Sequence, residues 1–272
     1  MTEQTIDLDA VKQIQQKIWS EGDFAMVAGL INIVGEELCK AAEILPGERV
    51  LDIACGSGNV TIPAARASWG NAVGLDYVPE LLERARERAA AERLEIELVE
   101  GDAEDLPFDD ASFDVVLSSF GVMFAPDQQK AADELLRICR PGGRIGLASW
   151  TPDGFVGDFF KTTAKHVPPP PGVAPPILWG TEDHLRELLG DGVSALRSER
   201  VTVREGFRSA DHFIEYFRTY FGPTKVAFER VGDEGAGPLE ADLREMLERW
   251  NTAGDRALVA DAEYLRTIAT RA

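Results

Sequence analysis

The alternation of short apolar runs with longer amphipathic segments predicts an α/β fold. Five apolar runs that end in turn residues are predicted to be strands, at residues 49–54, 71–76, 95–102, 113–120 and 144–150. Amphipathic patterns between them predict helices at residues 60–68, from Pro79 onward, and at 127–140. Strands that alternate with helices are typical of a doubly wound, mostly parallel sheet.

The segments on either side of this core follow other patterns. Residues 8–20 and about 23–42 predict two helices before the first strand. Prolines concentrate within residues 151–180, which are therefore predicted to be an extended, stiff insertion rather than a helix. A helix at 181–189 and a strand around Val201, Val203 and Phe207 resume the alternation, and residues 263–270 predict a last strand.

These patterns predict a division of the chain into a core and a cap. The division has four parts: N-terminal helices forming a lid or cap at 1–45, a cofactor-binding core at 46–207 with a cap insertion at about 151–180, a second helical cap insertion at 208–256, and the final core strand at 257–272. Aromatic residues are dense outside the core alternation. We therefore expect the cap segments to cover the carboxyl edge of the sheet and to enclose an apolar pocket.

The charge and the cysteine content of the chain limit the kinds of partner, metal site and disulfide that we expect. With 28 Lys and Arg against 47 Asp and Glu, the net charge of −19 argues against nucleic acid and anionic lipid as partners. Three scattered cysteines without CxxC spacing argue against disulfides and a zinc site, so no metal is expected and a reducing cytoplasm fits. The apolar stretch at 24–34 is shorter than the roughly 20 residues that span a bilayer, and the acidic segment before it lacks the basic start of a signal peptide.

A glycine loop follows the first predicted strand. The sequence from Asp52 to Gly58, DIACGSG, precedes a predicted helix, and its glycines let the backbone approach a ligand closely. Dinucleotide-binding loops prefer a third Gly or Ala where this chain has Thr61. The loop therefore favours a nucleoside-like ligand without a pyrophosphate.

The next three predicted strands end in residues that can bind other parts of a nucleoside-like ligand or its neighbour in the site. Asp76, followed by Tyr77, ends the second strand where a carboxylate can accept hydrogen bonds from a ribose diol. Asp102 and the Ala103 amide end the third, where they can bind an adenine edge. The fourth ends in SSFGVMF at 118–124, which offers carbonyls for an ammonium group and apolar side chains for a substrate.

Four segments together resemble the class I S-adenosylmethionine-dependent methyltransferases that include the ubiquinone and menaquinone C-methyltransferases. They are VLDIACGSGNVT, GLDYVPELLERAR, VEGDAEDLPFDDASFDVVLSSFGVMF and LLRICRPGGRIGLASW, in that order over about 50–150. The resemblance implies a seven-stranded Rossmann-like sheet with helical cap insertions. The remaining segments, including WTPDGFVGDFF and FRTYFGPT, look like an actinobacterial-type branch, which implies no particular acceptor.

The resemblance also implies roles for individual residues in binding S-adenosylmethionine. The backbone of Ala54 and Gly56 would meet the methionine moiety, and the Ser119 carbonyl its amino group. Asp76, with Tyr77 beside it, would bind the ribose. Asp102 and Ala103 would bind the adenine, and Asp52 would orient the loop or reach the ammonium through water.

The acceptor side is less defined by the sequence. Phe24, Phe120, Met123 and Tyr216 are the candidate lining residues. A sulfonium methyl is a strong electrophile, so the protein has mainly to align the acceptor and exclude water. Should a phenol or activated carbon need a general base, His166 and His212 are the candidates.

The expected reaction is methyl transfer to a small aromatic or apolar molecule, by O- or C-methylation in quinone or secondary metabolism, leaving S-adenosylhomocysteine. Two alternatives stay open at this point. A nicotinamide-dependent oxidoreductase would share the first two motifs, although Thr61 argues against it. A protein that binds S-adenosylmethionine without transferring its methyl group would share all four.

Overall fold

A computed structural model describes residues 7–272 and contains one seven-stranded mixed sheet. The strands are β1 (Val50–Ile53), β2 (Ala72–Asp76), β3 (Glu97–Glu100), β4 (Phe113–Ser119), β5 (Cys139–Trp150), β6 (Val193–Phe207) and β7 (Leu258–Arg271). Their order is β3-β2-β1-β4-β5-β7-β6. β1 to β5 pair in parallel, while β7 pairs antiparallel with both β5 and β6. The predicted doubly wound, mostly parallel sheet is confirmed.

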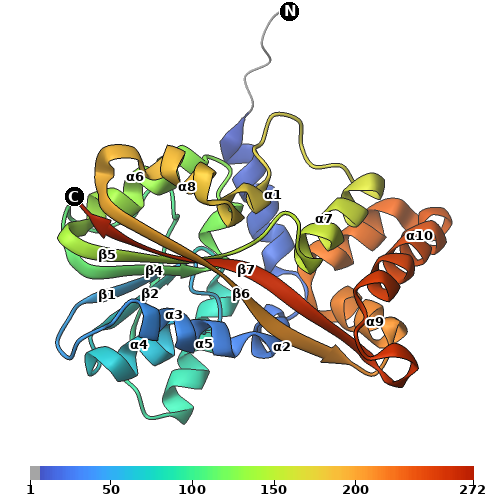
Figure 1. The fold of residues 1–272 in the computed structure, drawn as a ribbon, viewed down its shortest axis with the longest axis horizontal. Helices are drawn as coiled ribbons and strands as arrows, with labels where there is room; N and C mark the ends of the chain where they lie inside the picture. Colours follow the sequence, from blue (N-terminus) through green and yellow to red (C-terminus); the bar gives the residue numbers. More distant parts are fainter. Residues whose placement is uncertain (1–6) are drawn as a thin grey trace, which may run out of the picture.

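Helices cover both faces of this sheet. One face carries α3 (Asn32–Ala41), α4 (Thr61–Ser68) and α5 (Pro79–Ala91), and the other carries α6 (Gln128–Ile138) and α8 (Glu182–Leu189) (Figure 1). Val50, Leu51 and Ile53 of β1 are fully buried between the two layers. A strand buried on both faces reads as a continuous apolar run, which is the pattern that predicted it.

Five other helices lie outside these two layers, and the last three of them gather beside the far end of the long β6–β7 pair (Figure 1). They are α1 (Leu8–Ser20), α2 (Phe24–Leu30), α7 (Phe155–His166), α9 (Ala210–Tyr220) and α10 (Gly222–Trp250). α10 is interrupted at Gly232, whose φ of 62° and ψ of −171° are not helical. Short 3-10 turns at Val122–Phe124, Pro176–Gly180, Gly190–Gly192 and Gly254–Arg256 join the larger elements.

Two of the predicted elements are wrong. The single helix expected at about 23–42 is interrupted at Ile31, whose ψ of 17° breaks it into α2 and α3. The insertion at 151–180 is not extended throughout, because α7 occupies Phe155–His166 and the proline run begins only after it ends. An amphipathic pattern does not reveal where a helix changes direction to pack on a different neighbour. The division of the chain into core and cap ranges stays a prediction.

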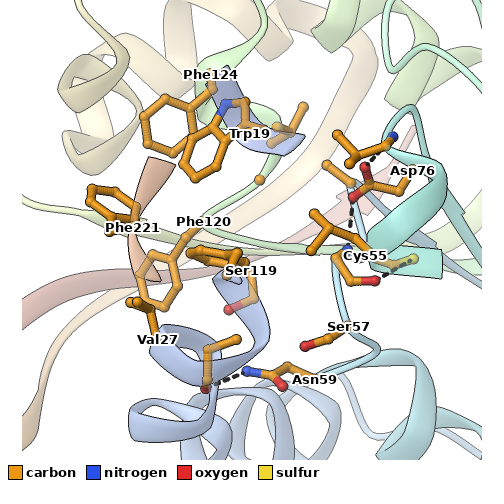
Figure 2. Close-up of a pocket in the computed structure, with 18 of the residues that line it drawn as sticks. Trp19, Val27, Cys55, Ser57, Asn59, Asp76, Ser119, Phe120, Phe124 and Phe221 are labelled. Atoms are coloured by element: carbon orange, nitrogen blue, oxygen red, sulfur yellow. Dashed lines mark hydrogen bonds between the residues drawn. The ribbon is translucent and has the colours of Figure 1, made fainter. Parts of the chain in front are cut away.

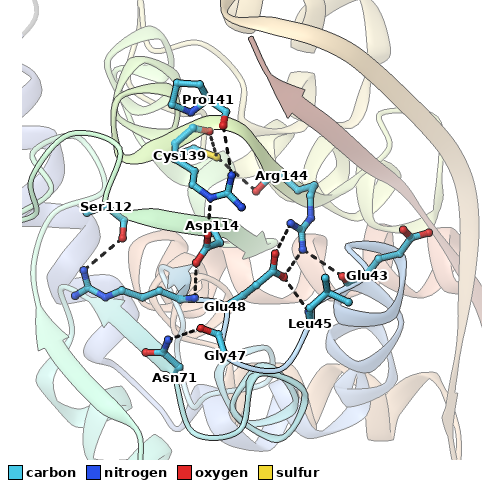
Figure 3. A network of polar contacts seen from close by, with 12 residues as sticks. Glu43, Leu45, Gly47, Glu48, Asn71, Ser112, Asp114, Cys139, Pro141 and Arg144 are labelled. Atoms are coloured by element: carbon cyan, nitrogen blue, oxygen red, sulfur yellow. Dashed lines mark hydrogen bonds and ion pairs between the residues drawn. The ribbon is translucent and has the colours of Figure 1, made fainter.

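A network of ion pairs and hydrogen bonds connects the segments around the amino ends of β4 and β5 (Figure 3). Arg144 of β5 donates to Glu48 (Nη1–Oε1 2.7 Å) and to the carbonyl of Ala42 (3.1 Å), which joins β5 to the end of α3. Asp114 of β4 accepts a hydrogen bond from the backbone amide of Arg49 at 2.7 Å. These contacts lie at the edge opposite the carboxyl ends of the parallel strands, which are the ends where open α/β sheets bind ligands.

Across residues 7–272, no helix is both long enough and apolar enough to cross a membrane.

Candidate cofactor and acceptor site

One large cavity opens at the carboxyl ends of the central strands. Its wall comes from the loops after β1, β2, β3 and β4, from the end of β5, and from α1, α2, α7, β6 and α9. Figure 2 shows Cys55, Ser57 and Asp76 on one side of it and the rings of Trp19, Phe124 and Phe221 on the other. Polar groups of the core and aromatic groups of the surrounding helices thus share one space.

The glycine loop is held open by Asp76. Ala54 and Gly56 both have left-handed backbone, with φ of 52° and 54°, and both line the cavity. The Gly56 amide donates to Asp76 Oδ2 at 2.8 Å, and the Val78 amide donates to Asp76 Oδ1 at 2.9 Å. Burial raises the pKa of Asp76 to about 6. Each carboxylate oxygen can accept a second hydrogen bond, so Asp76 can still bind a diol.

Asp52 lies beneath this loop instead of lining the cavity. It is 1% exposed, and its Oδ2 accepts a hydrogen bond of 2.6 Å from the Thr61 hydroxyl. Burial raises the pKa of Asp52 to about 7. Of the two roles expected for Asp52, orienting the loop is the one that fits this contact. The same hydrogen bond gives a structural reason for Thr61 at the position where dinucleotide-binding loops carry glycine or alanine.

Asp102 is joined to α1 through a lysine that sequence reasoning missed. Lys12 Nζ lies 2.7 Å from Asp102 Oδ2 and 2.8 Å from Glu104 Oε2. Burial disfavours the charged form of Lys12 and by itself lowers the pKa of the ammonium group. The hydrogen bonds and charges of Asp102 and Glu104 together have the larger effect, so the pKa of Lys12 is raised. Asp102 Oδ1 also accepts the Glu104 amide at 2.9 Å. The contact between Lys12 and Asp102 crosses 90 residues of chain, so no local pattern could signal it.

Lys12→Met is expected to lower the free energy of unfolding by about 2 kcal/mol, because Glu104, only 2% exposed, would lose its cationic partner. Chemical denaturation measures this loss. Lys17→Met is the matched control, since Lys17 is exposed on the same helix. Equal stabilities of the two variants would contradict an anchoring role for Lys12.

The remaining expected cofactor residues also line the cavity, namely Tyr77, Ala103 and Ser119. The Tyr77 carbonyl accepts the Gln16 side chain, which brings α1 over this part of the site. Ser118 donates to the Ile53 carbonyl at 2.7 Å and accepts the Val122 amide at 3.0 Å. The first bond fixes the end of β4 beside the end of β1, and the second fixes the turn that follows β4.

Aromatic side chains form the other half of the cavity. Phe120, which has φ of 60°, stacks on Trp150 with ring centroids 3.8 Å apart. Trp19 of α1 packs edge-on against Phe24, Phe124 and Phe221, at centroid distances of 5.4, 4.9 and 5.6 Å. Phe24 and Phe120 both line the cavity.

Four other expected residues lie elsewhere, and these expectations are wrong. Met123 is fully buried in the core. The Tyr216 hydroxyl donates to the Met26 carbonyl at 2.8 Å and ties α9 to α2. His166 pairs with Asp242 at 2.9 Å, and His212 accepts the Arg208 amide through Nδ1. Neither histidine lines the cavity, so neither is placed to act as a base there.

Sequence reasoning also missed Glu205. This residue of β6 lines the cavity, is 6% exposed, and has its pKa raised to about 7 by burial. A signal was present, because Glu205 occupies the same phase of the strand as the buried Val203 and Phe207. Burying a charged residue at a position where the strand otherwise carries apolar side chains is unfavourable. Such a residue indicates either an unfavourable feature of the packing or a group with a function.

Comparisons with known proteins agree with this geometry. A family profile described as "Methyltransferase domain" matches residues 51–147. An uncharacterised protein of Mycobacterium tuberculosis is 41% identical over 259 residues, which cover 93% of each chain. The demethylmenaquinone methyltransferase of Deinococcus radiodurans is 41% identical over 124 residues, 44% of this chain and 52% of that one. The crystal structure of YcgJ from Bacillus subtilis superposes with a TM-score of 0.61 at 19% identity, covering 87% of this chain and 97% of that one.

The chain belongs to the class I S-adenosylmethionine-dependent methyltransferases. Within them, the similarity to the mycobacterial protein extends over nearly the whole chain, whereas the similarity to the demethylmenaquinone methyltransferase covers less than half of it. Membership rules out the nicotinamide-dependent oxidoreductase.

The cavity fits the cofactor of this family. Among the described residues that line it, Lys12 is the only lysine or arginine, and two carboxylates already occupy its ammonium group. A pyrophosphate would therefore meet Asp76 without a free cation nearby, whereas a cationic, phosphate-free ligand meets compatible groups. When bound, S-adenosylmethionine supplies an electrophilic methyl group.

Proposed function

We propose that the protein transfers a methyl group from S-adenosylmethionine to a small acceptor with an aromatic or apolar body, by O- or C-methylation in quinone or secondary metabolism. One observation carries the proposal: the loop expected to hold the methionine moiety and a wall of aromatic rings line the same cavity. Apolar surfaces with few polar groups are typical of sites for small apolar ligands. We also propose a cytoplasmic location, which suits the free cysteines Cys39, Cys55 and Cys139.

In this proposal the residues act by holding and enclosing the reactants. Asp76 binds the ribose, Asp102 and Ala103 the adenine, and Ala54, Gly56 and Ser119 the methionine end. Trp19 and Phe120 keep water from the acceptor. Holding two reactants in line replaces an improbable encounter in solution and supplies a large part of the rate.

Titration calorimetry with S-adenosylmethionine and S-adenosylhomocysteine tests the cofactor half. Both ligands should bind the wild type, and Asp76→Ala should weaken both by about 2 kcal/mol, because a charged hydrogen-bond acceptor is lost and the Gly56 amide loses its partner. Asp109→Ala is the control, since Asp109 is exposed and outside the cavity. If neither ligand binds the wild type, the proposal fails.

A screen of phenols, quinols and apolar carbon acceptors, scored by release of S-adenosylhomocysteine, tests the acceptor half. Product release with members of these classes, and not with nucleic acid, is the expected result. A protein that binds the cofactor without methylating would bind both ligands and release no product with any acceptor, which would contradict the proposal.

A further inference from the structure

One carboxylate projects into the cavity from the distal half of β6. Glu205 lies opposite Ala260 of β7, between Val203 and Phe207 on the inward face of the strand. Val203 and Phe207 are each 6% exposed, as is Glu205 itself. Between Val201 and Phe207 the inward face is therefore apolar except at this one position.

The side chains nearby in the cavity wall are aromatic. Phe213 and Phe217 of α9 line the cavity and stack with centroids 4.1 Å apart. Phe207 packs edge-on against Phe213 at 4.9 Å. The neighbouring arginine on β6, Arg204, points to the other face of the strand, where it pairs with Asp261 at 2.8 Å.

Glu205 differs from the other buried acidic residues in having no partner. Asp52 accepts a hydrogen bond from Thr61, Asp76 accepts two backbone amides, and Glu104 contacts Lys12. Within residues 7–272, no hydrogen bond or ion pair reaches the Glu205 carboxylate, and burial is the only cause of its pKa shift. Burying a carboxylate without a partner is costly, so its presence at the cavity wall calls for a ligand that satisfies it.

We propose that Glu205 is the polar end of the acceptor site and binds a hydrogen-bond donor on the acceptor, either a hydroxyl or a protonated amine. The apolar body of the acceptor would pack among the rings of Phe155, Phe213 and Phe217, which line the same cavity. The inference rests on the proposed function and specifies the acceptor further: it has an apolar body and at least one O–H or N–H group.

The physical basis is the chemistry of an isolated carboxylate. An ionised carboxyl group only accepts hydrogen bonds, so the group that meets it must donate. Aromatic rings in the same cavity add attraction for a cation that lies over their faces. Bonds to a charged partner in a dry site are among the stronger ones, whereas a hydrocarbon placed there would leave the carboxylate without a partner.

Three probes of similar size test this inference: 2-phenylethanol, 2-phenylethylamine and propylbenzene. Their binding to protein saturated with S-adenosylhomocysteine is measured by calorimetry at about pH 8, above the raised pKa of Glu205, where the carboxyl group is ionised. The wild type should bind at least one of the two donor probes about tenfold more tightly than propylbenzene. Glu205→Leu should remove this preference. Glu205→Gln should retain it for the alcohol and lose it for the amine, because an amide can accept a hydrogen bond but carries no charge.

The variants separate this inference from the proposed function. Glu199→Leu is the matched control, because Glu199 lies on the same strand, is exposed, and pairs with Arg266 outside the cavity. Retained binding of S-adenosylhomocysteine shows that a variant is folded. If Glu205→Leu does not fold, Glu205→Gln, whose side chain has nearly the same shape as that of glutamate, takes its place in the test. Equal affinities for all three probes, no measurable affinity for any, or an unchanged preference in Glu205→Leu would overturn the role of Glu205. Absence of S-adenosylhomocysteine binding to the wild type would instead overturn the proposed function.

Discussion

Gly35→Ala is expected to lower the free energy of unfolding by about 3 kcal/mol and to weaken cofactor binding. Gly35 lies in α3 where the helix crosses the end of the glycine loop, and a Cβ atom built there would stand 2.0 Å from the backbone oxygen of Asn59. Backbone cannot yield as the end of a flexible side chain can. Either α3 must move away from the sheet or the loop at Asn59 must shift.

The loop has little freedom to shift. The Asn59 side chain donates to the Ala28 carbonyl at 2.8 Å and accepts from Arg88 at 2.7 Å, so α2 and α5 hold it from two sides. Asn59 also lines the cavity. A displacement large enough to admit a methyl group would therefore disturb the cofactor loop.

Gly29→Ala is the control for this prediction. Gly29 lies inside α2, and nothing is within 4 Å of a Cβ built there. Alanine should stabilise that helix by about 0.5 to 1 kcal/mol through its higher helix propensity. Chemical denaturation and calorimetry with S-adenosylhomocysteine measure both variants. A Gly35→Ala protein as stable as the wild type would show that α3 does not pack as closely on the loop as described.

Glu205→Gln is expected to gain stability relative to the wild type as the pH rises. Burial raises the pKa of Glu205 from its usual 4.5 to about 7 in the folded protein. Below the lower value the residue is protonated in both states and contributes no pH dependence. Between the two values the unfolded chain has released its proton while the folded protein retains it, so wild-type stability falls as the pH rises. Above the higher value both states are ionised and the loss is complete.

The size of this effect follows from the shift. Each pH unit within the window costs the wild type about 1.4 kcal/mol, so the difference between variant and wild type should grow by about 2.5 kcal/mol between about pH 5 and about pH 8. Denaturation of both proteins across this range measures the difference, in which the other titrating groups cancel. Glu199→Gln, changed at an exposed residue, should show no such trend. A flat difference for Glu205→Gln would mean that the carboxylate is not buried unpaired.

Such a result would bear on function as well as stability. A buried residue that destabilises the free protein above neutral pH is typical of a binding site, where such costs in stability are usual.

The core of the fold and the cofactor edge could be predicted from local patterns. A strand buried on both faces is a short apolar run, and the loop that follows it must supply glycine or small residues where the backbone adopts positive φ, as at Gly56. Asp76 ends β2 and Asp102 follows the end of β3, and parallel strands bring their carboxyl ends to one edge. Each of these features depends on a few consecutive residues of the chain.

The acceptor side could not be predicted in this way. Trp19, Phe155 and Phe213 lie on three helices far apart in the sequence, and an aromatic residue on an amphipathic helix has the same pattern whether it faces a cavity or packs in a core. The same ambiguity explains why the expectation for Tyr216 is wrong and why the sequence does not place the histidines.

The sequence by itself thus determined the sheet, the cofactor edge and the membership of the methyltransferase class, because these depend on short segments whose geometry is local. Tertiary structure alone decided which side chains enclose the acceptor, that Lys12 reaches Asp102, and that Glu205 has no partner. Those facts depend on how α1, β6 and α9 pack over the carboxyl edge. Burial and pairing between distant segments are properties of the folded chain, and no spacing along the sequence encodes them.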